Sequence, residues 1–204
     1  PDLIAVDMVP ASNDRKKMMM AANSYQNYLN NEEFGYQYQY VRNTLQLNLG
    51  PAWKDTAGTS HPVFADIAFY AGVAETDWSW APLFVDFDND GWRDLMITNG
   101  YPKDITDRDF MTYRASANKI APKEKILDQI PEVKLSNFVF KNSDGTRFTD
   151  KTADWNFDSP SFSSGAAYGD LDNDGDMDLV INNTNQVAMV YKNKAIEKLS
   201  DNQY

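Results

Sequence analysis

The sequence predicts an all-β fold assembled from repeated units, and three observations support this prediction. First, a template of alternating aspartates, D-x-D-x-D-G-x-x-D, occurs at Asp86–Asp94 and again 84 positions later at Asp170–Asp178. Second, each copy runs directly into a short segment of strand character, Leu95–Thr98 or Leu179–Asn182. Third, aromatic residues make up 13% of the chain and stand in short runs bounded by Gly, Asn, Asp and Pro, as is typical of strands.

The repeat extends beyond these two loops. Asp2 aligns with Asp94 and Asp178, as though the chain opened on the last aspartate of an earlier loop, and we expect a fragment of a longer chain. The strand-like matches are Leu45–Asn48 with Phe138–Asn142 and with Val190–Asn193, and Phe64–Asp66 with Phe148–Asp150. The predicted segments are the end of a preceding loop and strand (1–8), a helical insertion (9–42), a repeat with its loop at 86–94 (43–100), a second helical insertion (101–136), a repeat with its loop at 170–178 and the start of a next unit (137–193), and a tail (194–204).

Both insertions are expected to be partly helical. In the first, Ser12 is a candidate N-cap ahead of a helix over Arg15–Tyr28. In the second, Pro122 suits a first helical position, Lys123–Ile130 would follow, and Pro131 would end the helix. Short strands in repeated units with insertions at one end of each unit predict a β-propeller, here about two full blades plus parts of the flanking blades. Closure would then need other blades of the same propeller or another protein chain to cover the open sheet edges.

The alternating aspartates predict two calcium sites. Carboxylates at every second position of a tight loop converge on one point, and calcium accepts six to eight oxygen ligands. Gly91 and Gly175 allow the sharp turn that such a loop requires. The predicted ligands are the side chains of Asp86, Asp88, Asp90 and Asp94 with the carbonyl of Trp92, and the side chains of Asp170, Asp172, Asp174 and Asp178 with the carbonyl of Asp176.

Two other interpretations of these loops were weighed. An acidic, solvated hairpin would use Asp and Asn only for their turn propensity, but the pattern occurs twice in register. An EF-hand requires a glutamate at the twelfth loop position, where this chain has Ile97 and Ile181, and the flanking segments are strand-like instead of helical. Dockerin-type loops are disfavoured for the same reasons.

Composition narrows the classes of function. The formal net charge of −11 disfavours nucleic acid as a partner, because phosphate binding needs a basic surface. The chain has no cysteine and one histidine, His61, which disfavours thiolate or multi-histidine metal sites. No apolar run reaches the roughly 20 residues of a transmembrane helix. Asp104, Asp107 and Asp109 lie close together, and helix capping explains them better than glycoside hydrolysis does.

The segment Phe162–Gly175, which reads FSSGAAYGDLDNDG, resembles an FG-GAP/VCBS repeat, the unit of the integrin α-chain propeller. Trp78–Pro82 leading into Asp86, with Asp2–Met8 before it, is most similar to the large VCBS-repeat surface proteins of Bacteroidetes. The resemblance covers about residues 43–100 and 137–193. It implies a calcium-binding, non-catalytic binding or scaffold module of a cell-surface or secreted protein, associated with the bacterial outer membrane.

The expected ligands of such a module are a protein or a glycan, and an alternative is part of a propeller-type polysaccharide lyase or glycosidase with its catalytic residues outside the calcium loops. A partner surface is expected on the insertion at 101–136, whose apolar residues exceed what a solvated loop needs. Packing of those residues on their own blade is the other possibility. They are Tyr101, Phe110, Met111, Tyr113, Ile126 and Leu127.

Overall fold

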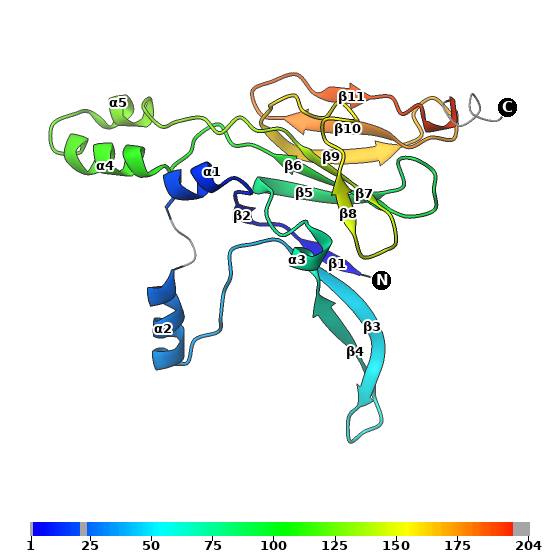
Figure 1. Cartoon of the computed structure of the whole chain (residues 1–204). Coiled ribbons are helices and arrows are strands. Elements are labelled where there is room, and N and C mark those ends of the chain that lie inside the picture. The colour runs from blue at the N-terminus through cyan, green and yellow to red at the C-terminus, as the bar shows by residue number, and fades with distance from the viewer. Residues whose placement is uncertain (1, 21–23, 198–204) are drawn as a thin grey trace.

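The computed structural model describes residues 2–20 and 24–197, and it is built mainly of antiparallel β-sheets with short helices beside them (Figure 1). The predicted tail at 194–204 therefore lies in part, from residue 198 on, outside the described residues. The first sheet has the order β1-β3-β4, the second β2-β5-β6-β7-β8 and the third β11-β10-β9. The strands are β1 (Leu3–Ala5), β2 (Met8–Val9), β3 (Thr44–Lys54), β4 (Ser60–Asp66), β5 (Asp77–Val85), β6 (Asp94–Asn99), β7 (Phe138–Asn142), β8 (Phe148–Asp150), β9 (Ser163–Gly169), β10 (Asp178–Asn183) and β11 (Met189–Tyr191). The predicted β-rich character is confirmed, whereas the three sheets do not by themselves display a closed propeller.

One pair of strands recurs in the same register in all three sheets. The pairs are β1 with β3, β6 with β7, and β10 with β11, and each is antiparallel. In every pair, the residue that follows an aspartate lies opposite the residue two positions before an asparagine. These partners are Leu3 with Gln46, Leu95 with Phe140, and Leu179 with Tyr191. The register therefore confirms the alignment of Asp2 with Asp94 and Asp178.

The asparagine and the aspartate of each pair are joined by the same hydrogen bond. In each copy the backbone N–H of the asparagine donates to Oδ1 of the aspartate, at 2.8 Å, 2.9 Å and 2.8 Å in chain order. We call this contact the Asp–Asn clasp; it joins Asp2 to Asn48, Asp94 to Asn142, and Asp178 to Asn193. The clasp ties the start of one strand to its neighbour, at or just beyond the end of β7 and β11 but in the middle of β3.

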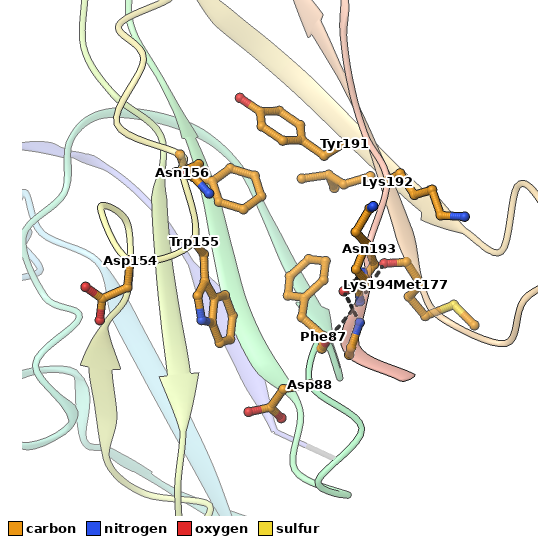
Figure 2. A pocket seen from close by; sticks show the side chains of 13 residues that line it. Phe87, Asp88, Asp154, Trp155, Asn156, Met177, Tyr191, Lys192, Asn193 and Lys194 are labelled. Atoms are coloured by element: carbon orange, nitrogen blue, oxygen red, sulfur yellow. Dashed lines mark hydrogen bonds between the residues drawn. The ribbon is translucent and has the colours of Figure 1, made fainter. Parts of the chain in front are cut away.

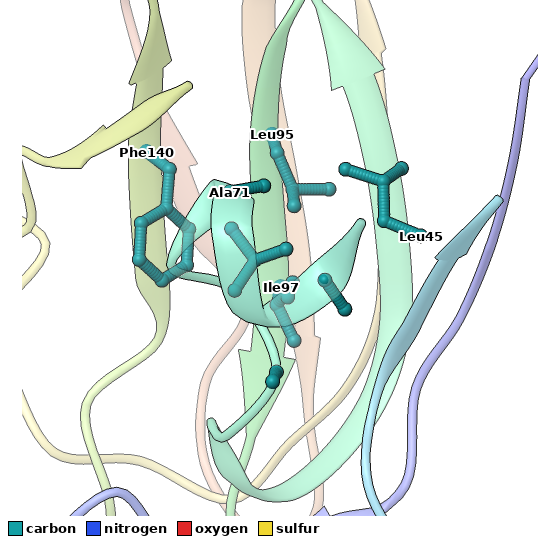
Figure 3. Packing of buried hydrophobic residues seen from close by; sticks show 8 residues of the cluster. Leu45, Ala71, Leu95, Ile97 and Phe140 are labelled. Carbon is teal, nitrogen blue, oxygen red and sulfur yellow. The ribbon is translucent and has the colours of Figure 1, made fainter. Parts of the chain in front are cut away.

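The hydrophobic core lies in two layers, one on each side of the second sheet. The side chains of β6 are buried along its whole length, and successive residues of a strand point to opposite faces. Leu95 and Ile97 accordingly pack with Leu45, Phe140 and the short helix α3 (Ala68–Ala71) on the side of the first sheet (Figure 3). Met96 packs on the opposite side in a second cluster shared with the third sheet, which also contains Val85, Phe87, Val139, Phe157, Leu179 and Ile181.

The first insertion contains two helices, α1 (Asn13–Met18) and α2 (Tyr25–Phe34), so the prediction of one helix over Arg15–Tyr28 is wrong in its extent. Ser12 caps α1 as predicted, because its Oγ accepts the backbone N–H of Arg15 at 3.2 Å. The helix ends where Met19 forms a β-bridge with Asp107, and the backbone N–H of Met20 donates to the Thr106 carbonyl at 2.7 Å. After Met19, the backbone therefore pairs with the second insertion instead of continuing the hydrogen bonds of α1.

The second insertion contains α4 (Arg108–Ala117) and α5 (Lys123–Leu127), of which only the second was predicted from the prolines. Pro122 stands at the N-cap of α5 instead of its first turn, and the helix ends three residues before Ile130. Asp107 caps α4 by accepting the backbone N–H of Phe110 at 2.8 Å, which confirms a capping role there. A small core of Phe110, Ala117, Ile126 and Ile130 holds the two helices together.

Arg15 fastens both insertions to the second sheet. Its Nε and one terminal nitrogen bind the two carboxylate oxygens of Asp77, each at 3.1 Å, and its other terminal nitrogen binds Asp104 at 3.1 Å. Asp77 begins β5, while Asp104 lies in the second insertion and is almost fully buried. A planar guanidinium with several fixed donors is well suited to bridging two carboxylates in this way.

A chain of buried polar side chains crosses all three sheets. Asn43, beside the first sheet, donates to Thr76 at 2.5 Å, and Thr76 contacts Ser79 at 2.7 Å. Ser79 donates to Asn99 at 2.8 Å, and the backbone N–H of Asn99 donates to Asn137 at 2.9 Å. The chain then continues into the third sheet through Ser163 and Asn183, at 3.0 Å and 2.8 Å. All seven of these side chains are buried.

This polar chain obeys the same repeat as the loops. Ser79 and Ser163 are 84 positions apart, as are Asn99 and Asn183. The amide oxygen of Asn43 accepts the backbone N–H of Asp7 at 2.8 Å, just as that of Asn137 accepts the backbone N–H of Asn99. Each repeat therefore contributes two asparagines and one serine to a continuous internal network.

Replacing Ser163 with alanine is expected to destabilise the protein by about 1–3 kcal/mol, because it leaves buried amide groups of Asn137 and Asn183 without their hydroxyl partner. Ser164 on the exposed face of the same strand is the matched control, since its hydroxyl contacts only Asn182, and Ser164→Ala should change stability by less than about 0.5 kcal/mol. Urea unfolding of the two variants measures the difference. Equal midpoints would show that the polar chain does not contribute to stability.

Candidate metal centres

The two acidic loops connect antiparallel strands at the same edge of their sheets. The first joins β5 to β6 and the second joins β9 to β10. Each loop reverses through an asparagine at its fourth position and a glycine at its sixth, all with positive φ: 57° at Asn89, 90° at Gly91, 68° at Asn173 and 92° at Gly175. Asparagine and glycine tolerate this left-handed backbone, which confirms the turning role predicted for the two glycines.

Three carboxylates converge in each loop. They belong to Asp86, Asp88 and Asp90 in the first and to Asp170, Asp172 and Asp174 in the second, and one oxygen from each lies within 4.8 Å of the others. Backbone amides hold the first and third of these carboxylates in the same way in both loops. Asp86 accepts the N–H groups of Asp90 and Gly91 at 3.2 Å and 3.0 Å, and Asp90 accepts that of Trp92 at 2.8 Å. The corresponding distances in the second loop are 3.1 Å, 3.1 Å and 3.0 Å.

A lysine from the neighbouring strand reaches each cluster. The Nζ of Lys141 donates to Asp88 and, at 2.8 Å, to Asp90. Lys192 donates to Asp172 at 2.5 Å and forms an ion pair with Asp174 at 3.2 Å. Each lysine directly precedes the asparagine of an Asp–Asn clasp. Neither lysine was predicted from the sequence, although their shared place before that asparagine was a signal that could have revealed them.

The charges of these groups depend on one another. Burial alone would lower the pKa of Lys141, but its hydrogen bonds to Asp88 and Asp90 outweigh burial and raise that pKa. The same bond, first among the causes, lowers the pKa of Asp90. In the second loop, the hydrogen bonds to Asp172 and Asp174 raise the pKa of Lys192. In both loops the carboxylates therefore favour the ammonium form of the lysine.

The last aspartate of each template lies below the cluster instead of within it. One oxygen of Asp94 accepts the backbone N–H of Phe87 at 3.0 Å, and the other takes part in the clasp with Asn142. Asp178 makes the equivalent bonds to Leu171, at 2.9 Å, and to Asn193. Burial raises the pKa of Asp94 to about 6, although its two backbone partners act in the opposite direction. Each of these two aspartates thus has a structural role through its hydrogen bonds to the backbone. Metal ligation by them stays a prediction.

The seventh loop position differs between the copies. The Trp92 ring is partly exposed, whereas the Asp176 side chain is completely buried. One Asp176 oxygen accepts the side-chain amide of Asn89 from the first loop at 2.6 Å, and the other accepts the backbone N–H of Ile196 at 3.0 Å. Asp176 thus links the two loops through its side chain. Metal ligation by the backbone carbonyls of Trp92 and Asp176 stays a prediction.

The residues of the first cluster fit a hard cation. All of the candidate donors are oxygen atoms, which calcium prefers. Within the described part of the chain, Oδ1 of Asp88 is the one buried side-chain polar atom that lacks a hydrogen-bond partner. A buried carboxylate oxygen without a partner is costly, and a metal ion would satisfy it. The donor set and this unsatisfied oxygen therefore support a calcium site.

A cavity of about 310 Å³ lies beside the loops, between the second and third sheets. Figure 2 shows Trp155 on one side and Lys192 on the other, with Phe87 between them and Asp88 below. The ring of Phe87 meets that of Trp155 edge-on at 6.3 Å, and the side-chain amide of Asn193 donates to the Phe87 carbonyl at 2.7 Å. The cavity wall thus shares residues with both loops and with one Asp–Asn clasp.

The remaining candidates from the sequence have structural contacts. Asp104 accepts from Arg15 and from Thr106, and the only histidine, His61, pairs with Asp55 at 3.1 Å. In the second insertion, Phe110 and Ile126 are buried in the small local core, whereas Tyr113 and Leu127 are about 40–46% exposed. The insertion therefore buries some of its apolar residues and presents others to solvent.

Comparison with protein-family models, with curated proteins and with solved structures found no match for this chain. None of the helices in the described residues has the length and apolar character needed to cross a lipid bilayer.

The raised pKa of Asp94 predicts a specific pH dependence of stability in metal-free buffer. The folded value of about 6 lies above the roughly 3.9 of an unfolded aspartate, so folding favours the protonated form. The contribution of Asp94 to the free energy of unfolding is thus fully present below about pH 4 and is lost as the pH rises to about 6, with an order of magnitude of 1–3 kcal/mol.

Asp94→Asn removes the titrating group, so the difference in unfolding free energy between the unaltered chain and the variant should change across this pH window. Urea unfolding at pH 4, 5 and 6.5 measures that difference. Asp154→Asn, at an exposed carboxylate paired with Lys151, is the control that should leave the pH profile nearly unchanged. Parallel profiles for the unaltered chain and Asp94→Asn would contradict the assignment.

Proposed function

We propose that this chain is a calcium-stabilised β-propeller module of the FG-GAP/VCBS type, and that it serves as a non-catalytic binding or scaffold part of a cell-surface or secreted protein. The observation that carries the proposal is the threefold recurrence of one strand pair with one register and one Asp–Asn clasp. Two of the three copies are preceded by a loop in which three carboxylates converge. A repeating unit that stacks through a shared core is the construction principle of propellers and related repeat folds.

Calcium would be held in the first loop by Asp86, Asp88 and Asp90, and in the second by Asp170, Asp172 and Asp174. Asp94, Asp178 and the carbonyls at the seventh positions are further proposed ligands. When bound, the ion supplies positive charge that relieves repulsion among the carboxylates and cross-links the loop. The role is structural, because the ion would stiffen the connection between two strands of one sheet.

The surroundings of the loops suit an extracellular location. Calcium sites in extracellular modules have dissociation constants of about 10⁻⁴–10⁻³ M, and loops as open as these fit that class. Several carboxylates outside the loops, among them Asp77, Asp104 and Asp107, are occupied by Arg15 or by helix capping. This occupation supports a binding module over the alternative of a glycoside-cleaving enzyme, whose paired carboxyl groups must face a substrate.

The recognition surface is proposed to lie on the two helical insertions. They project at one end of the sheets (Figure 1), and Arg15 holds them in place. Exposed tyrosines of the first insertion are stacked, with ring centroids 5.5 Å apart for Tyr28 and Tyr38 and 6.2 Å apart for Tyr38 and Tyr40. Aromatic rings of this kind supply large contact areas to protein or glycan ligands at low entropic cost.

The calcium assignment is tested by replacing one central aspartate in each loop. Isothermal titration calorimetry with calcium should detect two sites in the unaltered chain and a loss of both in the double variant Asp88→Ala, Asp172→Ala. At a calcium concentration 100 times the dissociation constant, binding should also add about 2.7 kcal/mol per site to the free energy of unfolding. Asp154→Ala is the control, since this exposed aspartate lies outside both clusters. Undiminished calcium uptake by the double variant would refute the assignment.

A further inference from the structure

Lys141 and Lys192 carry an inference that rests on the proposed calcium sites and goes beyond them. We propose that each lysine is a built-in competitor for its calcium site: its ammonium group holds the cluster, and calcium must displace that group to bind. The two lysines would thereby weaken calcium affinity and set the concentration at which the loops become occupied.

The competition follows from which carboxylate oxygens are still available. In the first loop, Oδ1 of Asp90 accepts the backbone N–H of Trp92, so Oδ2 is the Asp90 oxygen without a backbone partner. Lys141 holds that Oδ2 at 2.8 Å. In the second loop, Oδ1 of Asp174 accepts the backbone N–H of Asp176, and Lys192 lies 3.2 Å from Oδ2. At the third carboxylate of each loop, Asp90 or Asp174, the ammonium thus occupies the oxygen that has no backbone partner and that a metal ion could bind.

Electrostatics makes simultaneous binding unfavourable. A divalent ion at 2.3–2.6 Å from these oxygens would lie within a few ångströms of an ammonium that contacts the same atoms. Like charges at such separations repel strongly, even at the higher effective dielectric of a protein surface. The side chains of Lys141 and Lys192 are 29% and 45% exposed, so each ammonium has a path into solvent when a metal ion replaces it.

The strand pairs do not need these lysines. In the first copy the corresponding position, directly before the clasp asparagine Asn48, is Leu47. That copy nevertheless forms the clasp with Asp2 at 2.8 Å and keeps the common register. The lysine is therefore not required by the strand or the clasp. Its shortest ion pairs are with the acidic loop beside it, and Lys192 has a longer one to Glu197 at 3.8 Å.

The test compares calcium affinities of chains that lack the competing charge. Lys141→Met and Lys192→Met keep the length of the side chain and remove its charge, and each should tighten calcium binding at its own loop by about tenfold, since charge-assisted hydrogen bonds are the strong class. Lys151→Met is the matched control, because Lys151 pairs with Asp154 away from both loops. Calorimetric titration with calcium chloride gives the dissociation constants.

A second measurement separates competition from a general effect on folding. Without calcium, each variant should melt at a lower temperature than the unaltered chain, because its carboxylates have lost their counter-ion. With saturating calcium the difference should shrink or reverse. Lys141→Gln and Lys192→Gln, which keep a hydrogen-bond donor without the charge, should behave in the same way and serve if a methionine variant does not fold.

The outcomes distinguish this inference from the proposed function. Calcium binding by the unaltered chain with equal or weaker affinity in the lysine variants would overturn the competition and leave the calcium sites standing. Absence of calcium binding in the unaltered chain and in every lysine variant would overturn the calcium sites, and the inference with them.

Discussion

The buried polar chain from Asn43 to Asn183 constrains the whole molecule. It passes through each sheet in turn, and a buried amide or hydroxyl that loses its partner costs more than a missing apolar contact. The sheets can therefore pack in only those arrangements that keep every link intact. The hydrophobic clusters on either side of β6 provide most of the driving force for packing, but they are non-directional. Directional hydrogen bonds supply the register that apolar contacts alone leave open.

The Asp–Asn clasp adds directional hydrogen bonds at the other end of the strands, where the acidic loops emerge. Asp94 and Asp178 are buried. In each, one carboxylate oxygen accepts a backbone N–H of the loop, and the other accepts the backbone N–H of the clasp asparagine. The loop is thus anchored at its base before any ion binds. Two of the three carboxylates above, Asp86 and Asp90 in the first loop, are held by further backbone N–H groups, so a cation meets donors that are partly oriented in advance. Such preorganisation lowers the entropic cost of binding.

The sequence predicted those features that depend on short, repeated patterns. The alternating aspartates fixed the loops, their glycines and the three carboxylates that converge, and the alignment of Asp2 with Asp94 and Asp178 matched the register of the strands. Ser12 and Asp107 capped helices as expected of their residue types. These predictions succeeded because each depends on a short local pattern, and the repeat displays one such pattern more than once.

Features that depend on long-range contacts escaped the sequence. The spacing between clasp partners is 48 residues for Asp94 and Asn142 but only 15 for Asp178 and Asn193, so Lys141 and Lys192 share no fixed distance from their loops. Asn137 and Ser163 were not predicted to be buried, because nothing in the neighbouring sequence marks them as such. The first helix was predicted too long because its end is set by pairing of Met19 with Asp107 in the other insertion.

The contacts of Arg15 also limit the range of positions that the first insertion can reach. The entropic cost of closing a loop grows only with the logarithm of its length, so a long insertion is tolerated, but its tip would otherwise sweep a large volume. Arg15 on one side and the buried Asn43 on the other fix two points of the insertion, and the exposed rings of Tyr28, Tyr38 and Tyr40 lie between them. The three rings are consequently held near the end of the sheets, which raises their effective concentration for a ligand that binds there.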